Sequence, residues 1–150
     1  MAHVMIVVSP YYQEISSHLL NGAKAALDEV RSTYEVVEVP GALEIPMALK
    51  LGQSRKETRD SDHRKFDAYV ALGCVIRGET SHYDIVCNES ASGLMQLALE
   101  YNMPIGNGIL TCDTKDQALV RADVSQKNKG ADAACAALHL FDLKRSYRVI

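Results

Sequence analysis

Short runs of β-branched and other apolar residues alternate along the chain with stretches in which apolar residues recur at helical spacing. The first run is HVMIVVS at residues 3–9, which ends at Pro10. A continuous apolar run of this length is typical of a strand buried on both faces. Between residues 13 and 31 the apolar positions recur every three or four residues, which predicts an amphipathic helix. A strand followed by a helix that returns along it is the repeating unit of a parallel sheet.

The same alternation continues to residue 145. It predicts three more strands, at 33–39, at 66–76 and within 103–113 with its end near Thr111. It also predicts four more helices, namely a short one after Gly41, a long one over 83–101, and two at 113–122 and 130–145. Because a proline inside a helix costs about 3 kcal/mol, Pro46 places the start of the short helix near Ile45.

We therefore predict an α/β fold: a three-layer α/β/α sandwich around a central, mainly parallel four-stranded sheet of the doubly wound, flavodoxin-like kind. Residues 66–76 form the most continuous apolar run and are expected to be a central strand. At 150 residues, the chain fits a single domain spanning 1–150.

Composition and charge exclude several classes of function. The net charge of −3 lacks the basic excess of a nucleic-acid-binding protein. Basic residues in 53–65 are interleaved with acidic ones, which predicts a solvated loop. The longest apolar stretch, 68–76, is far shorter than the ~20 residues that cross a bilayer, and MAHVMIVV lacks the basic region and cleavage site of a signal peptide. We expect no membrane association, a soluble protein and a cytoplasmic location.

Four cysteines are present, at positions 74, 87, 112 and 135. Their spacing contains no C-x-x-C pair of the kind used for metal binding or redox chemistry. We expect free, buried thiols, as is usual in a reducing compartment.

Candidate binding residues fall in the loops that follow the predicted strands, where ligands bind in sheets of this kind. These loops are SPYY, VPGALE, RGETSH and LTCDT, at 9–12, 39–44, 77–82 and 110–114.

The GETSH segment has two possible interpretations. Thr80, Ser81 and the backbone N–H groups around them suit a phosphate or carboxylate, but the same residues suit a simple helix N-cap. His82 has a side chain that can carry protons near neutral pH, yet a lone histidine in a first helical turn is more often structural.

Other candidates also have two interpretations each on the residues alone. Arg121 is either an anion ligand or a solvated side chain, and Glu44 either contacts a polar ligand or caps the helix before Pro46. Tyr11 and its neighbour Tyr12 either stack on a planar ligand or pack in the core.

Four segments in order resemble the lumazine synthase family. They are VPGALEIP (39–46), LGCVIRGETSHYDIVCNES (72–90), GILT (108–111) and the R-x-x-x-x-x-x-N-K-G spacing of 121–130. The resemblance implies condensation of 5-amino-6-(D-ribitylamino)uracil with 3,4-dihydroxy-2-butanone 4-phosphate, releasing phosphate and water. This is the penultimate step of riboflavin biosynthesis, and no cofactor or metal is expected.

The resemblance also implies roles for individual residues. His82 would be the catalytic proton carrier, and the butanone phosphate would lie on Glu79, Thr80 and Arg121. The ribitylaminouracil would contact the remaining matched positions, which are Tyr11, Ala42, Leu43, Glu44, Cys74, Val75, Ile76 and Asn107. Two of these depart from the usual pattern, since Tyr11 replaces a common phenylalanine and Asn107 stands where relatives often carry an apolar or aromatic residue.

The family assembles as pentamers, some of which form 60-subunit shells, with each active site between adjacent subunits. We therefore expect a homopentamer. The main alternative function is a noncatalytic flavin or lumazine carrier of the same fold, and a less favoured one is a different phosphate-binding α/β enzyme. Both His82 and Arg121 are present, which argues against a carrier.

Overall fold

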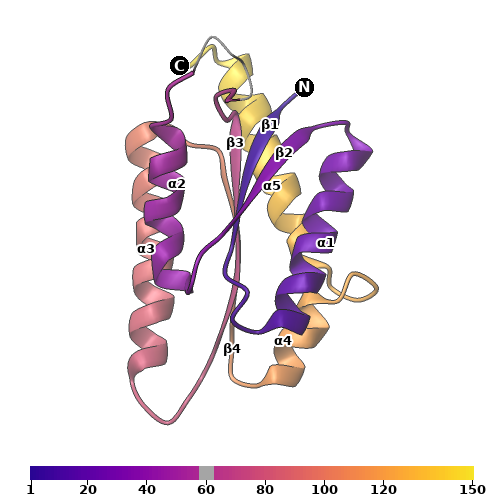
Figure 1. The fold of residues 1–150 in the computed structure, drawn as a ribbon, viewed down its shortest axis with the longest axis vertical. Helices are drawn as coiled ribbons and strands as arrows, with labels where there is room; N and C mark the ends of the chain where they lie inside the picture. Colours follow the sequence, from indigo (N-terminus) through magenta and orange to yellow (C-terminus); the bar gives the residue numbers. More distant parts are fainter. Residues whose placement is uncertain (58–62) are drawn as a thin grey trace.

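The computed structural model describes residues 1–57 and 63–150, which form four strands and five α-helices (Figure 1). In chain order these are β1 (His3–Val8), α1 (Gln13–Glu29), β2 (Thr33–Glu38), α2 (Ile45–Gln53), β3 (Ala68–Ile76), α3 (His82–Tyr101), β4 (Ile105–Cys112), α4 (Lys115–Ala122) and α5 (Lys129–Ser146). A single 3₁₀ turn, η1 (Ala42–Glu44), precedes α2.

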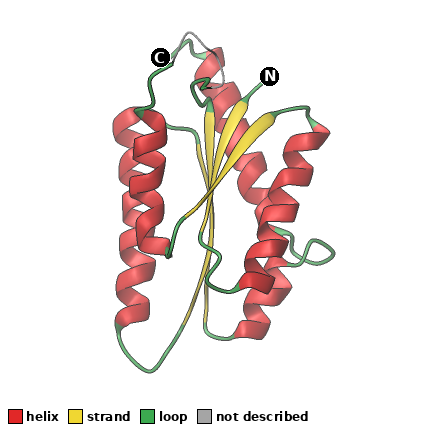
Figure 2. Cartoon of the chain, viewed as in Figure 1, coloured by secondary structure: helices red, strands yellow, loops and turns green. Residues whose placement is uncertain are grey.

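The four strands (yellow in Figure 2) form one sheet. Their order is β2-β1-β3-β4, and every neighbouring pair is parallel. Val4 of β1, for example, lies opposite Tyr34 of β2 and Ala68 of β3. The predicted sheet is confirmed, with β3 in a central position. Strands β2 and β4 are the two edges.

Helices cover both faces of the sheet, with α2 and α3 on one face and α1, α4 and α5 on the other (Figure 1). Successive residues of β1 point to opposite faces. Ile6 packs with Ile15 and Leu19 of α1, whereas Val7 packs with Ile45 of α2. All six residues of β1 are buried, as the apolar run predicted, and the three-layer α/β/α sandwich is confirmed.

Two helix starts show how local chemistry fixes an element. Helix α2 begins at Ile45 with Pro46 in its first turn, as predicted, because the missing proline N–H has no partner to lose there. Helix α4 begins at Lys115, two residues later than predicted. The Thr114 hydroxyl accepts a hydrogen bond from the Gln117 amide (3.2 Å), and the Gln117 side chain accepts one from the Thr114 amide (3.3 Å).

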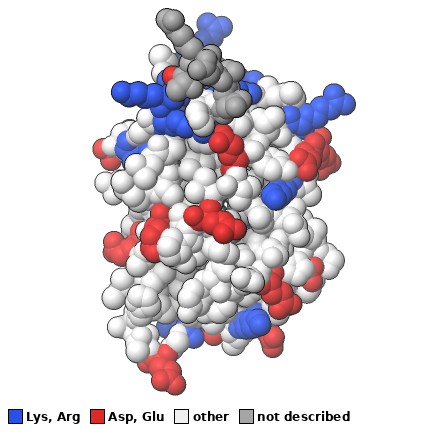
Figure 3. Space-filling view, viewed as in Figure 1, with Lys and Arg blue, Asp and Glu red and all other residues white. Residues whose placement is uncertain are grey.

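The interpretation of residues 53–65 as a solvated loop is wrong for Arg55. Its guanidinium donates hydrogen bonds to both Glu35 carboxylate oxygens, at 3.0 and 2.8 Å, and lies 4.1 Å from the centre of the Phe66 ring. A bidentate pair of this kind holds the segment against β2. Residues 58–62, part of the same interpretation, lie outside the described residues. Lysine and arginine side chains gather at the end of the molecule where α2 ends and β3 begins, at the top of the view (Figure 3).

In the described part of the chain, no helix is long and apolar enough to cross a membrane. All four cysteines are free, as predicted, but their predicted burial holds only for Cys112. Cys135 is exposed, and Cys74 and Cys87 are partly exposed.

Candidate active site

The strand order creates a crevice between the carboxyl ends of β1 and β3. The chain leaves β1 toward α1 on one face of the sheet and leaves β3 toward α3 on the other. Such a topological switch point is where doubly wound proteins bind ligands. A cavity of about 390 Å³ lies there, and three of the four loops singled out in the sequence line it: 9–12, 39–44 and 77–82.

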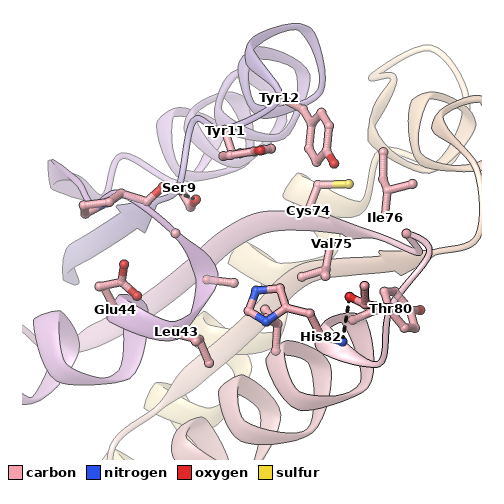
Figure 4. A pocket seen from close by; sticks show the side chains of 16 residues that line it. Ser9, Tyr11, Tyr12, Leu43, Glu44, Cys74, Val75, Ile76, Thr80 and His82 are labelled. Atoms are coloured by element: carbon pink, nitrogen blue, oxygen red, sulfur yellow. Dashed lines mark hydrogen bonds between the residues drawn. The ribbon is translucent and has the colours of Figure 1, made fainter.

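Tyrosines form one wall of this cavity. Tyr11 and Tyr12 follow β1, and their rings meet edge to face with centroids 4.9 Å apart. Tyr11 is 73% exposed, so the interpretation as a core residue is wrong for it. Figure 4 shows both rings on one side of the cavity, with His82 and Thr80 on the other. An exposed ring at this position offers a planar ligand a stacking surface.

The end of β3 forms the floor, through Cys74, Val75 and Ile76. The pairing of β3 with β1 stops at Leu72, where the Ser9 amide donates to the Leu72 carbonyl (2.9 Å), but β3 itself continues to Ile76. Within the described structure, the β1 side of this stretch therefore has no strand partner. Its outward-facing backbone donors and acceptors are open to the cavity, a pattern suited to a flat, polar heterocycle.

Cys74 also lines the floor, where its surroundings disfavour the thiolate. Burial, followed by the neighbouring Cys112 and Cys87 thiols, raises the pKa of Cys74 to about 12. The thiolate is the nucleophilic form of cysteine. Cys74 is therefore poorly suited to act as a nucleophile at neutral pH.

Glu44 contributes a carboxylate to the same cavity. It occupies the N-cap position of α2, yet its side chain accepts no capping hydrogen bond there, so the alternative interpretation as a helix cap is wrong. The residue is exposed, and Figure 4 shows its carboxylate beside the cavity. A carboxylate in this place can accept hydrogen bonds from ligand hydroxyl or N–H groups.

The GETSH segment forms the remaining wall. Ser81 is the N-cap of α3 but makes no capping bond, whereas the Thr80 hydroxyl oxygen accepts a hydrogen bond from the His82 amide (3.3 Å, Figure 4). His82 is exposed in the first turn of α3 and lines the cavity. Among the described residues its ring makes no hydrogen bond, so both ring nitrogens are open to a ligand. Glu79 lies beside Thr80 but is outside the cavity lining.

Arg121 and Asn107 lie elsewhere. Both line a second hollow of about 410 Å³ on β4, α4 and α5, and β4 is an edge of the sheet. The Arg121 guanidinium donates to the Gln117 carbonyl (3.0 Å), and the Asn107 side chain accepts from the Ile109 amide (2.9 Å). Lys129 also lines this hollow and was missed as a candidate, although its place in the N-K-G part of the motif offered a signal.

No group of three or more His, Cys, Asp or Glu side chains within 1–57 and 63–150 is placed to hold a metal ion. The fold and the cavity instead define an α/β enzyme for small molecules, with an aromatic wall, an open strand end, a carboxylate and an imidazole around one chamber.

Comparison with known proteins identifies the family. Residues 1–145 match the family model described as 6,7-dimethyl-8-ribityllumazine synthase. A protein of that name from Azorhizobium caulinodans is 51% identical over 96% of this chain and 87% of its own length. Proteins of the same name from Sphingopyxis alaskensis and Zymomonas mobilis subsp. mobilis are 48% and 51% identical, over 99% and 97% of this chain and 99% and 98% of their own lengths. The chain belongs to the 6,7-dimethyl-8-ribityllumazine synthase family.

Proposed function

We propose that this chain condenses 5-amino-6-(D-ribitylamino)uracil with 3,4-dihydroxy-2-butanone 4-phosphate to 6,7-dimethyl-8-ribityllumazine, in the penultimate step of riboflavin biosynthesis. The observation that carries the proposal is His82 on the wall of the switch-point cavity in a chain that matches this family over residues 1–145. Phosphate and water are the other products. We place the reaction in the cytoplasm and in a single domain spanning 1–150.

The uracil ring is assigned to the chamber between Tyr11 and the end of β3. Stacking on the exposed Tyr11 ring would hold one face of the heterocycle. The open backbone of Cys74, Val75 and Ile76 would pair with its polar edge. The hydroxyl-rich ribityl chain would run toward Ala42, Leu43 and Glu44, where the free carboxylate can accept its hydrogen bonds.

The phosphate is assigned to the GETSH segment. Glu79 and Thr80 precede the N-terminus of α3, where backbone N–H groups and the helix dipole favour an anion. Arg121 would complete this site from the neighbouring subunit, together with Asn107 on the uracil side. Two observations support sharing between subunits: both residues line a hollow separate from the cavity of their own chain, and that hollow lies on an edge strand.

His82 is assigned the proton transfers. Attack of the amine on the ketone, loss of water, elimination of phosphate and ring closure each move a proton. An imidazole with both nitrogens free can accept and return these protons near neutral pH. Much of the acceleration would come from holding two substrates together, since orientation contributes roughly 7–11 kcal/mol in favourable cases.

We also propose a homopentamer. Helices α2 and α3 expose large apolar side chains in the single chain, among them Met47 (60%), Leu51 (61%), Met95 (61%) and Leu99 (75%). Apolar side chains gathered on the outer face of one helical layer are typical of a surface that is covered in an assembly. Dilute protein should sediment as a multiple of five subunits, and a fully active monomer would contradict the proposal.

An assay of the purified protein with both substrates, without added cofactor, tests the function directly. Formation of the lumazine is followed by its absorbance, with His82→Ala protein as the matched control. Turnover by the unaltered chain supports the proposal. Tight binding of the lumazine without turnover would instead support a noncatalytic carrier.

A further inference from the structure

Arg77 joins three segments around the GETSH loop. It is the first residue after β3, and its guanidinium donates a hydrogen bond from Nε to the Asp113 carboxylate at 2.9 Å. The same guanidinium lies 4.3 Å from the centre of the Tyr83 ring and 3.8 Å from the Asp84 carboxylate. Asp113 belongs to the connection between β4 and α4, and the other two partners belong to the first turn of α3.

The loop that Arg77 begins has few other contacts. Residues 77–82 are exposed, and an ideal Cβ built on Gly78 would meet no atom within 4 Å. The one side-chain hydrogen bond within the loop is the local one from the His82 amide to Thr80. The start of the loop is held by the Arg77 amide, which donates to the Cys112 carbonyl (2.9 Å), and by the Arg77 guanidinium through Asp113. The end of the loop is held to the same guanidinium through the first turn of α3.

We infer that Arg77 is a positioning residue that fixes the GETSH loop, and with it the His82 imidazole, by clamping the first turn of α3 to the β4–α4 connection. The inference rests on the proposed function for its kinetic consequence. Tyr83 transmits the clamp, since one contact of its ring is with Arg77 while the residue itself lines the cavity next to His82.

Arg77 itself does not line the cavity in the described structure, so it acts through the loop rather than on the substrate. Each of its contacts is weak alone, because the side chains of Arg77, Asp84 and Asp113 are 50%, 59% and 63% exposed. Together they converge on one planar guanidinium, which can satisfy several partners at once in a fixed geometry. The rest of the loop has few contacts, so losing those of Arg77 should shift the loop without lowering the global stability of the protein.

Three variants test the clamp. Arg77→Gln removes the cation, Asp113→Asn removes its nearest partner, and the double variant removes both. Arg145→Gln is the matched control, since Arg145 is also exposed, pairs with Asp142 at 3.3 Å and lies 5.3 Å from the centre of the Phe141 ring, remote from the cavity. Amide hydrogen exchange of residues 78–84 is measured on the ligand-free protein, and turnover is measured on the same samples.

The clamp predicts faster exchange at 78–84 by about tenfold in both single variants, with the global melting temperature unchanged and the control normal. It predicts a fall in kcat of between about 5-fold and 100-fold, as for other small displacements of catalytic groups. The double variant should be no worse than Arg77→Gln alone, because the contact between Arg77 and Asp113 is already lost in that single variant.

Unchanged exchange in Arg77→Gln would overturn the inference. So would a large kinetic loss in Arg77→Gln with unchanged exchange at 78–84, because that pattern means that Arg77 acts on the substrate and not through the loop. If the unaltered chain shows no turnover, the proposed function fails, but the exchange measurement still decides whether Arg77 holds the loop.

Discussion

His82 and Arg121 line different hollows of the same chain. His82 stands in the first turn of α3, on the cavity between β1 and β3, whereas Arg121 stands near the end of α4, on the hollow beside the edge strand β4. We propose that one phosphate-bearing substrate meets both side chains, and that they are supplied by two copies of the chain. This relationship connects the proposed chemistry to the proposed assembly.

Replacing His82 with alanine should lower turnover by roughly 10² to 10⁴, the usual contribution of a general acid or base. The residue is exposed, so thermal unfolding and assembly should remain nearly unchanged. Single-turnover rates and melting curves on the same sample check both points, with His139→Ala, an exposed histidine on α5, as the control. A lower melting temperature with normal chemistry would make His82 a structural residue.

Replacing Arg121 with alanine should weaken use of the phosphorylated butanone far more than binding of the ribitylaminouracil, because a charge-assisted contact to the anion is lost. Arg121→Lys should recover only part of the loss, since an ammonium cannot present a bidentate fork. Steady-state kinetics with each substrate varied in turn measures the difference, and Lys115→Ala on the same helix is the control. Equal losses for both substrates would give Arg121 another role.

Glu35 gives the fold a predictable dependence on pH. Hydrogen bonds from Arg55, and then from His3, lower the pKa of Glu35 to about 2, despite partial burial. The resulting stabilisation is fully present above the ordinary value near 4.5 and is lost as the pH falls toward 2. The side chain is 37% exposed, so solvent screening limits its contribution to about 1 kcal/mol.

Denaturant unfolding should therefore give Glu35→Gln a lower free energy of unfolding than the unaltered chain at pH 7. This deficit should shrink between about pH 5 and about pH 2, the limits set by the same linkage. Asp142→Asn, in an exposed pair with Arg145, should show almost no deficit at either pH. A deficit for Glu35→Gln that is constant with pH would mean that the ion pair is not its cause.

Gly106 of β4 is required for packing. A Cβ on this residue would collide with the backbone carbonyl of Ala133 in α5, and backbone cannot move aside as a side-chain tip can. Gly106→Ala should cost about 3 kcal/mol of unfolding free energy, at the upper end of overpacking effects. Gly78→Ala is the matched control, because its Cβ would enter open space. Equal stabilities of the two variants would contradict this packing.

The layers of the fold were predictable because the local pattern of apolar residues indicates which faces of a strand or helix are buried. The run at 3–9 is apolar throughout since both faces of β1 are covered, and Pro46 fixed the start of α2. The start of α4 was missed by two residues because the Thr114 cap, rather than the preceding Asp113, ends the loop. In a polar segment several neighbouring residues can serve as the N-cap, and the sequence alone does not show which of them does.

Contacts between distant segments were not predictable from local patterns. The pair formed by Arg55 and Glu35 joins residues twenty positions apart, so the charge pattern of 53–65 alone indicated solvent. The separation of Arg121 from His82 depends on β4 being an edge strand, which follows from the strand order. The motifs selected the residues, but only the fold shows which of them one chain brings together.

The most direct test mixes two impaired variants, His82→Ala and Arg121→Ala, within one assembly. Each variant is assayed alone, and both are then co-expressed with different tags so that mixed particles can be isolated. If adjacent subunits share each site, random mixing in equal amounts restores both residues at about one quarter of the sites, with a matching fraction of the wild-type rate. A mixed assembly with only the average rate of its two parents would contradict the shared site.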